Sequence, residues 1–122
     1  MTNSLTIHMA QKETLDWCKE TFGEEISMNV MERCLRFAEE STELVQALGL
    51  PKEKALAIVE YVYGRPKGEY FQEAGGTIIT YFALCNAILI DAGEAYSTEV
   101  DRCYDKQDEI RKKAMAKELR GF

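Results

Sequence analysis

Residues 77–90 are apolar almost throughout, and they constrain the fold more than any other part of the chain. These 14 positions hold no charged residue. A helix that is apolar on every side needs cover on every side, so it normally lies at the centre of a bundle. We therefore expect a helix from about Tyr70 to Ile90 to be the most buried element. The apolar run is shorter than the roughly 20 residues that span a bilayer, so we expect no membrane partner.

The other segments repeat apolar residues at helical spacing, and none alternates as a strand does. We expect helices over residues 6–22, from a Ser27 cap to Leu48, over 51–63, and from a cap at Ser97 or Thr98 to Lys117. The chain of 122 residues therefore predicts one all-α domain over residues 1–122, a four- to five-helix bundle. Four or five helices are too few to cover an apolar central helix completely. We therefore expect oligomerisation to complete the core.

The charge and the cysteines narrow the class of protein. A net charge of −6 argues against a general nucleic-acid binder, which usually has a basic surface. The four cysteines are widely spaced and form no CxxC pair, which is typical of free thiols in a reducing compartment. The first residues show neither a basic nor an apolar leader segment. We therefore expect a cytoplasmic protein.

Three glutamates lie together in the middle of the second expected helix. Glu40 and Glu43 are three residues apart, so a helix places them on one face, and Glu39 directly precedes Glu40. Arg36 is the one basic residue at helical spacing from them. Such a group is either a solvated acidic face or a set of oxygen ligands for a hard divalent cation. Its position far from either helix end, where no helix dipole stabilises negative charge, favours the second interpretation.

The start of the long apolar helix carries two further features. Glu73 supplies a carboxylate from a second helix, and together with Glu40 and Glu43 it predicts a magnesium site between two helices. Gly75 and Gly76 follow, and each costs about 1 kcal/mol in a helix relative to alanine. Either another helix packs closely there, or a phosphate or hydrated metal approaches the backbone. In the preceding loop, Arg65 and Lys67 are candidates for binding phosphate oxygens, or belong to an ordinary polar turn.

Residues 36–49, with the sequence RFAEESTELVQALG, resemble the Glu-Glu-x-x-Glu motif of MazG-like nucleoside triphosphate pyrophosphohydrolases. Residues 63–69 and 73–80 are similar to a branch of the same family, and the likeness extends from about Trp17 to Lys113. The resemblance implies a MazG-like all-α bundle that assembles as a homodimer or homotetramer. It also implies hydrolysis of nucleoside triphosphates to the monophosphate and pyrophosphate with Mg²⁺, with Mn²⁺ as the alternative ion.

The resemblance also implies roles for single residues. By position, Glu40, Glu43 and Glu73 match metal ligands, and Glu39 matches an outer acidic residue. Lys106 matches a phosphate-binding lysine on the last helix. The chain departs from the family at Gly76, where the pattern has an aspartate.

Two functions from different classes follow. In the first, Glu39 or Glu43 is the general base for attack of water on the α-phosphorus. The cations Arg65, Lys67 and Lys106 then stabilise the departing pyrophosphate. Trp17 is a candidate for stacking on the base, although a lone tryptophan is more often part of a core or interface. The alternative is a non-catalytic helical module that senses nucleotides or binds a partner, and Gly76 is its main support.

Overall fold

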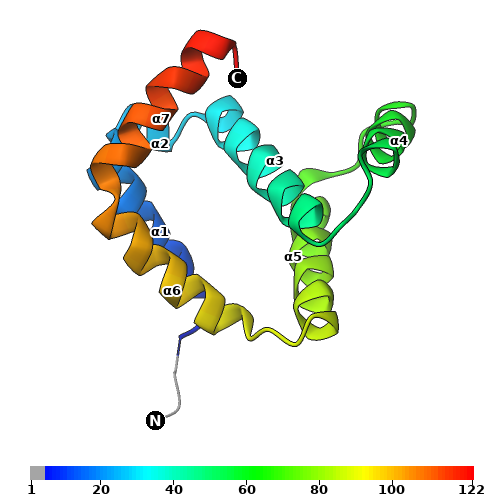
Figure 1. The fold of residues 1–122 in the computed structure, drawn as a ribbon, viewed down its shortest axis with the longest axis horizontal. Helices are drawn as coiled ribbons and strands as arrows, with labels where there is room; N and C mark the ends of the chain where they lie inside the picture. The colour runs from blue at the N-terminus through cyan, green and yellow to red at the C-terminus, as the bar shows by residue number, and fades with distance from the viewer. Residues whose placement is uncertain (1–4) are drawn as a thin grey trace. The chain divides into compact units, whose positions relative to one another are not determined.

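A computed structural model describes residues 5–122, so residues 1–4 of the predicted domain lie outside the described part. Over the described range the chain forms seven α-helices and no strand (Figure 1). They are α1 (Ile7–Phe22), α2 (Glu24–Ser27), α3 (Val30–Ala47), α4 (Lys52–Tyr63), α5 (Tyr70–Ala87), α6 (Ala92–Asp105) and α7 (Gln107–Arg120). The prediction of an all-α chain is confirmed.

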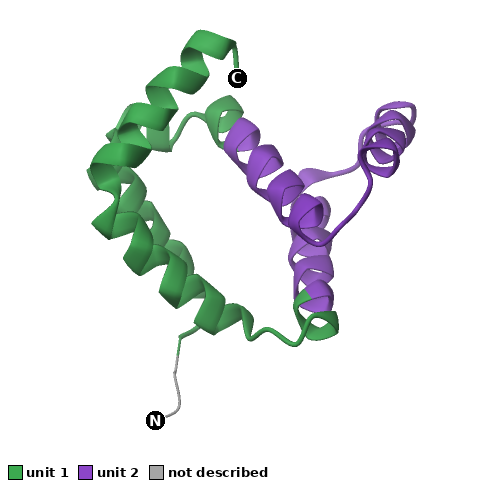
Figure 2. Cartoon of the chain, in the orientation of Figure 1, with its two compact units in different colours: residues 1–33, 85–122 green, residues 34–84 purple. Residues whose placement is uncertain are grey.

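The helices group into two compact units (Figure 2). Unit 1 comprises residues 1–33 and 85–122, and unit 2 comprises residues 34–84. The boundaries fall inside α3 and α5. Unit 1 therefore contains α1, α2, α6 and α7, whereas unit 2 contains α4 and most of α3 and α5.

Unit 1 is held together by packing around α1. This helix packs against α2, α6 and α7, and α6 also packs against α7. On α6, the Tyr96 hydroxyl lies 2.9 Å from the carbonyl oxygen of Ala10 and 3.1 Å from the hydroxyl of Thr14. These contacts join residues more than 80 positions apart and fix α6 against the first half of α1.

The last turn of α1 is bound by α7. The guanidinium of Arg111 donates through Nε to the Thr21 carbonyl at 2.8 Å and through Nη2 to the Glu20 carbonyl at 3.3 Å. The Gln107 amide donates to the Glu20 carboxylate at 2.7 Å. The last carbonyls of a helix lack partners within it, so Arg111 satisfies carbonyls that α1 cannot satisfy itself.

The start of α3 differs from the prediction. Ser27, expected as its N-cap, instead ends the short helix α2, and its hydroxyl donates to the Gly23 carbonyl at 2.7 Å. Asn29 is the residue whose side chain caps α3, because its Oδ1 accepts from the Glu32 amide at 2.9 Å. Gly23 adopts φ 84°, a conformation that glycine reaches easily. This turn separates α1 from α2, which had not been predicted.

The predicted last helix is two helices. The first begins at Ala92 rather than near Ser97, because the Asp91 carboxylate accepts from the Glu94 amide at 2.8 Å. Asp91 therefore starts a helix as an N-cap. A break at Lys106, with φ −114° and ψ 24°, then separates α6 from α7.

In unit 2 the helices share little packing. No residue of 34–84 is buried, and the extensive helix–helix packing in the described chain lies in unit 1. Figure 1 shows α4 standing apart from α3 and α5. On α5, Phe71 is 81% exposed and Ile79 is 68% exposed. The prediction that this helix is the most buried is wrong for the single chain, because no other described helix packs along it.

Three segments end in the same backbone motif. Gly49, Leu89 and Gly121 have φ of 93°, 60° and 87°. At Leu89 the amide donates to the Asn86 carbonyl, and the next amide donates to the Cys85 carbonyl at 2.9 Å. This paired arrangement terminates helices. It explains why α5 ends at Ala87 and does not continue to Ile90.

Candidate functional site

The acidic turn of α3 lies in unit 2. Arg36 Nη1 is 2.9 Å from Glu39 Oε1, and the two side chains are only 18% and 26% exposed. Glu40 and Glu43 are exposed on the same side of the helix. The turn thus places the Glu39 carboxylate against a guanidinium and puts Glu40 and Glu43 at exposed positions.

The hydroxyls inside this turn are directed into the helix. Ser41 donates to the Phe37 carbonyl at 2.8 Å, and Thr42 donates to the Ala38 carbonyl at 2.6 Å. Hydroxyls bonded in this way to the preceding turn point away from a ligand. The carboxylates are therefore the groups that this turn offers to a cation.

Glu73 lies in the first turn of α5 and faces the preceding loop. Its carboxylate lies so close to Gly68 that a Cβ at position 68 would collide with Oε2. The helix is started by Glu69, whose carboxylate accepts from the Phe71 amide at 2.8 Å and the Gln72 amide at 3.3 Å. Sequence analysis missed both Gly68 and Glu69. An acidic residue just before the expected helix start was the available signal for Glu69.

The space around Gly75 and Gly76 is open. In the described part of the chain, no atom lies within 4 Å of a Cβ placed at either position, apart from the local backbone. Close packing within the chain therefore does not explain these residues. A Cβ, the first atom of an aspartate side chain, would therefore meet no clash at position 76.

The predicted metal ligands do not meet in a single cluster. Among residues 5–122, no three His, Cys, Asp or Glu side chains are grouped closely enough to hold a metal ion. Glu40 and Glu43 are nevertheless one turn apart on α3. Magnesium usually takes only one or two protein carboxylates and completes its shell with waters and substrate phosphates. The roles of Glu40, Glu43 and Glu73 as metal ligands therefore stay predictions.

The two cations of the loop after α4 are placed differently. The Arg65 guanidinium lies over the Tyr61 ring, 4.5 Å from its centroid. Such stacking orients the planar group. Lys67 is exposed and makes no hydrogen bond or ion pair with the described residues. Both side chains are accessible to an anion from solvent.

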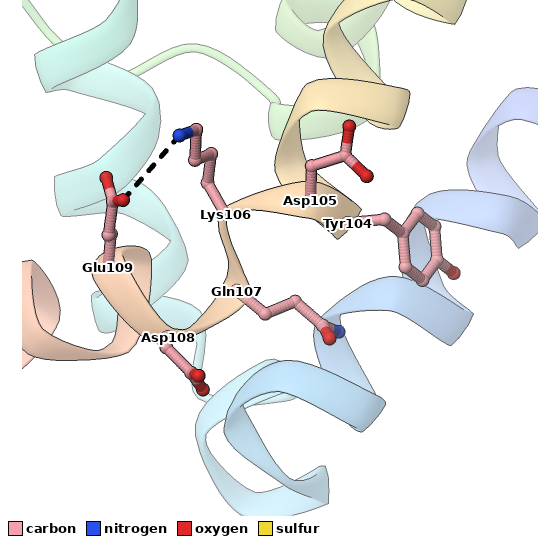
Figure 3. A pocket seen from close by; sticks show the side chains of 6 residues that line it. All are labelled: Tyr104, Asp105, Lys106, Gln107, Asp108 and Glu109. Carbon is pink, nitrogen blue, oxygen red and sulfur yellow. Dashed lines mark ion pairs between the residues drawn. The ribbon is translucent and has the colours of Figure 1, made fainter.

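The remaining candidates, Trp17 and Lys106, belong to unit 1. Lys106 lines a shallow hollow of about 270 Å³ at the junction of α6 and α7 (Figure 3). The other lining residues are Tyr104, Asp105, Gln107, Asp108 and Glu109. Lys106 Nζ lies 3.7 Å from Glu109 Oε1. With three carboxylates beside one lysine, this hollow alone disfavours a triphosphate.

Trp17 packs within unit 1. Its ring meets Phe22 edge to face, with centroids 5.5 Å apart. The side chain is half-buried, and within the described residues its Nε1 is shielded without a hydrogen-bond partner. These contacts account for a tryptophan at this position by packing. Its role in stacking on a nucleotide base stays a prediction.

Comparison with known proteins gives no match to any family model, curated protein or solved structure. The likeness to MazG-like enzymes therefore stays a prediction from the residues quoted above. Among the described helices, none is by itself long and apolar enough to cross a membrane; α5 and α6 meet such a test only as a sharply bent pair.

Proposed function

We propose that the protein is a magnesium-dependent hydrolase that cleaves nucleoside triphosphates to the monophosphate and pyrophosphate, and that it works as a homo-oligomer. The observation that carries the proposal is the acidic turn of α3. In this turn Glu40 and Glu43 lie one turn apart at exposed positions, and the Glu39 carboxylate lies 2.9 Å from the Arg36 guanidinium.

The carboxylates of this turn have different proposed roles in binding the cation and activating water. Glu40 and Glu43 would hold the cation, with Glu73 as the third ligand. A Mg²⁺ ion held there would supply charge neutralisation at the phosphates and orientation of the reacting oxygens. Because Arg36 already engages Glu39, we favour Glu43 as the group that accepts the proton of the attacking water. Glu39 then positions that water.

The loop after α4 binds the leaving group. Arg65, oriented by Tyr61, and the accessible ammonium of Lys67 match the charge that develops on pyrophosphate as the α–β bond breaks. Lys106 and Trp17 stay proposed contacts to phosphate and base.

Pyrophosphate release from a panel of canonical and modified nucleoside triphosphates tests this proposal. With Mg²⁺ present, the wild type should release pyrophosphate, and Glu40→Gln and Glu43→Gln should each lower kcat by about a hundredfold or more. Glu60→Gln removes an exposed carboxylate of α4 and serves as the matched control. A wild type without turnover, or equal rates in all four proteins, would refute the proposal.

A non-catalytic helical module is the second candidate. The exposed apolar side chains of α4 and α5 favour it, because large apolar surfaces commonly mark interaction sites. Calorimetry separates the two functions. Nucleotide binding that persists in EDTA, without turnover in Mg²⁺, would establish the second and exclude the first.

A further inference from the structure

We infer that Glu73 and Gly68 form a latch that holds the loop between α4 and α5, and that Gly68 is a positioning residue for the cations of this loop. The latch keeps Arg65 and Lys67 where they bind pyrophosphate. The inference rests on the proposed function only in taking these two cations as the anion-binding groups. It gives Glu73 a role in the loop that is separate from its proposed role as a metal ligand.

The first half of the loop is restrained by α4 and by a proline. The Gly64 amide donates to the Glu60 carbonyl at 3.0 Å. The Arg65 guanidinium lies over the Tyr61 ring, 4.5 Å from its centroid. Pro66 has a fixed φ and also restricts the backbone of the residue before it. The chain therefore has little freedom from the end of α4 to the proline.

Gly68 is the flexible joint in the second half of the loop. Glycine has more backbone freedom than any other residue, and this one directly follows Lys67. Beyond it the chain is restrained again, because the Glu69 carboxylate accepts from the Phe71 amide at 2.8 Å. A contact at Gly68 therefore restrains the joint that lies next to the Lys67 ammonium-bearing residue.

The Glu73 side chain makes this contact. A Cβ at position 68 would lie 3.0 Å from Glu73 Cδ and 3.4 Å from its Cγ, and it would collide with Oε2. Gly68 does not have the positive φ that favours glycine. At such a position alanine usually stabilises a protein, because it restricts the unfolded chain. The structural reason for a glycine at position 68 is therefore the space that the Glu73 carboxylate occupies.

Moving one carbon atom between the two positions tests the latch. Gly68→Ala adds a carbon where the carboxylate packs, and Glu73→Asp withdraws the carboxylate by one methylene. Each single variant should weaken pyrophosphate binding by about tenfold, because a loop that is no longer held must be ordered on binding. The double variant, Gly68→Ala with Glu73→Asp, should bind to within about threefold of wild type, because the two changes compensate at one contact.

Calorimetry with pyrophosphate in EDTA measures these affinities on the full chain. Without a divalent cation, metal ligation by Glu73 does not contribute. Gly93→Ala is the matched control and should bind like wild type: its added Cβ also meets a carboxylate, but at an ordinary 3.4 Å from Asp91 Oδ2. All these variants keep the charge of the wild type. Circular dichroism should show equal helix content, because Gly68→Ala displaces only the end of a flexible side chain.

Trypsin cleavage after Lys67 measures the order of the loop without any anion. Glu73→Asp leaves both residues of the cleaved bond unchanged, so its rate compares directly with that of the wild type. A loop without the latch opens more often, so Glu73→Asp should be cut about threefold faster or more. Gly93→Ala should be cut at the rate of the wild type.

Three results would overturn the inference: a wild type that does not bind pyrophosphate, a double variant that binds no tighter than Gly68→Ala, or equal cleavage of Glu73→Asp and wild type. Recovered binding in the double variant, without turnover of nucleoside triphosphates by the wild type in Mg²⁺, would support the inference and contradict the proposed function.

Discussion

Replacing Arg111 with methionine tests how α7 stabilises unit 1. Methionine keeps most of the side-chain length and removes the guanidinium. The change leaves the Thr21 and Glu20 carbonyls without the donors at 2.8 and 3.3 Å. It also removes the ion pair of Arg111 with Asp108 at 2.9 Å, whose carboxylate is 91% exposed.

These contacts differ in energy. A hydrogen bond from a charged group contributes about 1.5–3 kcal/mol, and a buried acceptor left unpaired costs about 1–3 kcal/mol. Thr21 is buried, but the Arg111 side chain is 40% exposed, which lets water replace part of the loss. The exposed pair with Asp108 adds little. We therefore expect Arg111→Met to lower the free energy of unfolding by about 2–3 kcal/mol.

Urea unfolding followed by Trp17 fluorescence measures this change, because the single tryptophan lies on α1 in unit 1. Lys113→Met is the control, since it removes one positive charge from an exposed position of the same helix. It should change stability by less than about 0.5 kcal/mol. Equal losses in the two variants would show that the bonds to α1 contribute no more than the net charge.

Three further predictions concern single residues. Gly76→Asp should tighten Mg²⁺ binding about tenfold in calorimetry by adding a carboxylate where the space is open; unchanged affinity would contradict the placement of the ion. Tyr96→Phe should cost about 1 kcal/mol in urea unfolding, through loss of the bond to the Ala10 carbonyl. Hydrogen bonds from Arg102 lower the pKa of Glu99. The pair therefore stabilises the fold at pH values above the pKa of Glu99 in the unfolded chain, and this stabilisation is lost as pH falls through the pKa of Glu99 in the folded chain. Glu99→Gln should lower the free energy of unfolding by a few tenths of a kcal/mol at neutral pH, and this difference should vanish in acid.

Local signals in the sequence predicted some helices well. The first expected helix agrees with α1, because the Thr6 side chain caps it by accepting from the Met9 amide at 3.1 Å. Pro51 and Gly64 bound α4 as expected. The role of Asp91 as an N-cap was harder to predict, since an aspartate followed by Ala-Gly suits the end of one helix and the start of another. The break at Lys106 has no glycine or proline to reveal it.

In the candidate site too, local spacing was predictable and the packing between helices was not. Glu40 and Glu43 share a face because helical spacing alone determines it. Whether Glu73 joins them depends on how α3 and α5 pack, and spacing within one helix carries no information about that. The prediction that α5 is buried was wrong because the sequence of one helix does not show which helices pack against it. Periodicity shows which side chains need cover but does not identify the surface that provides it.

Leu89 stands where the two equivalent turns have glycine, and its side chain is 92% exposed. A left-handed backbone disfavours any residue with a Cβ, by roughly 1–2 kcal/mol. A glycine at this position would make the turn more stable and would remove an apolar group that touches water on nearly every side. Leu89 is therefore not the residue that would make this turn most stable. The single substitution Leu89→Gly should raise the stability of the isolated chain.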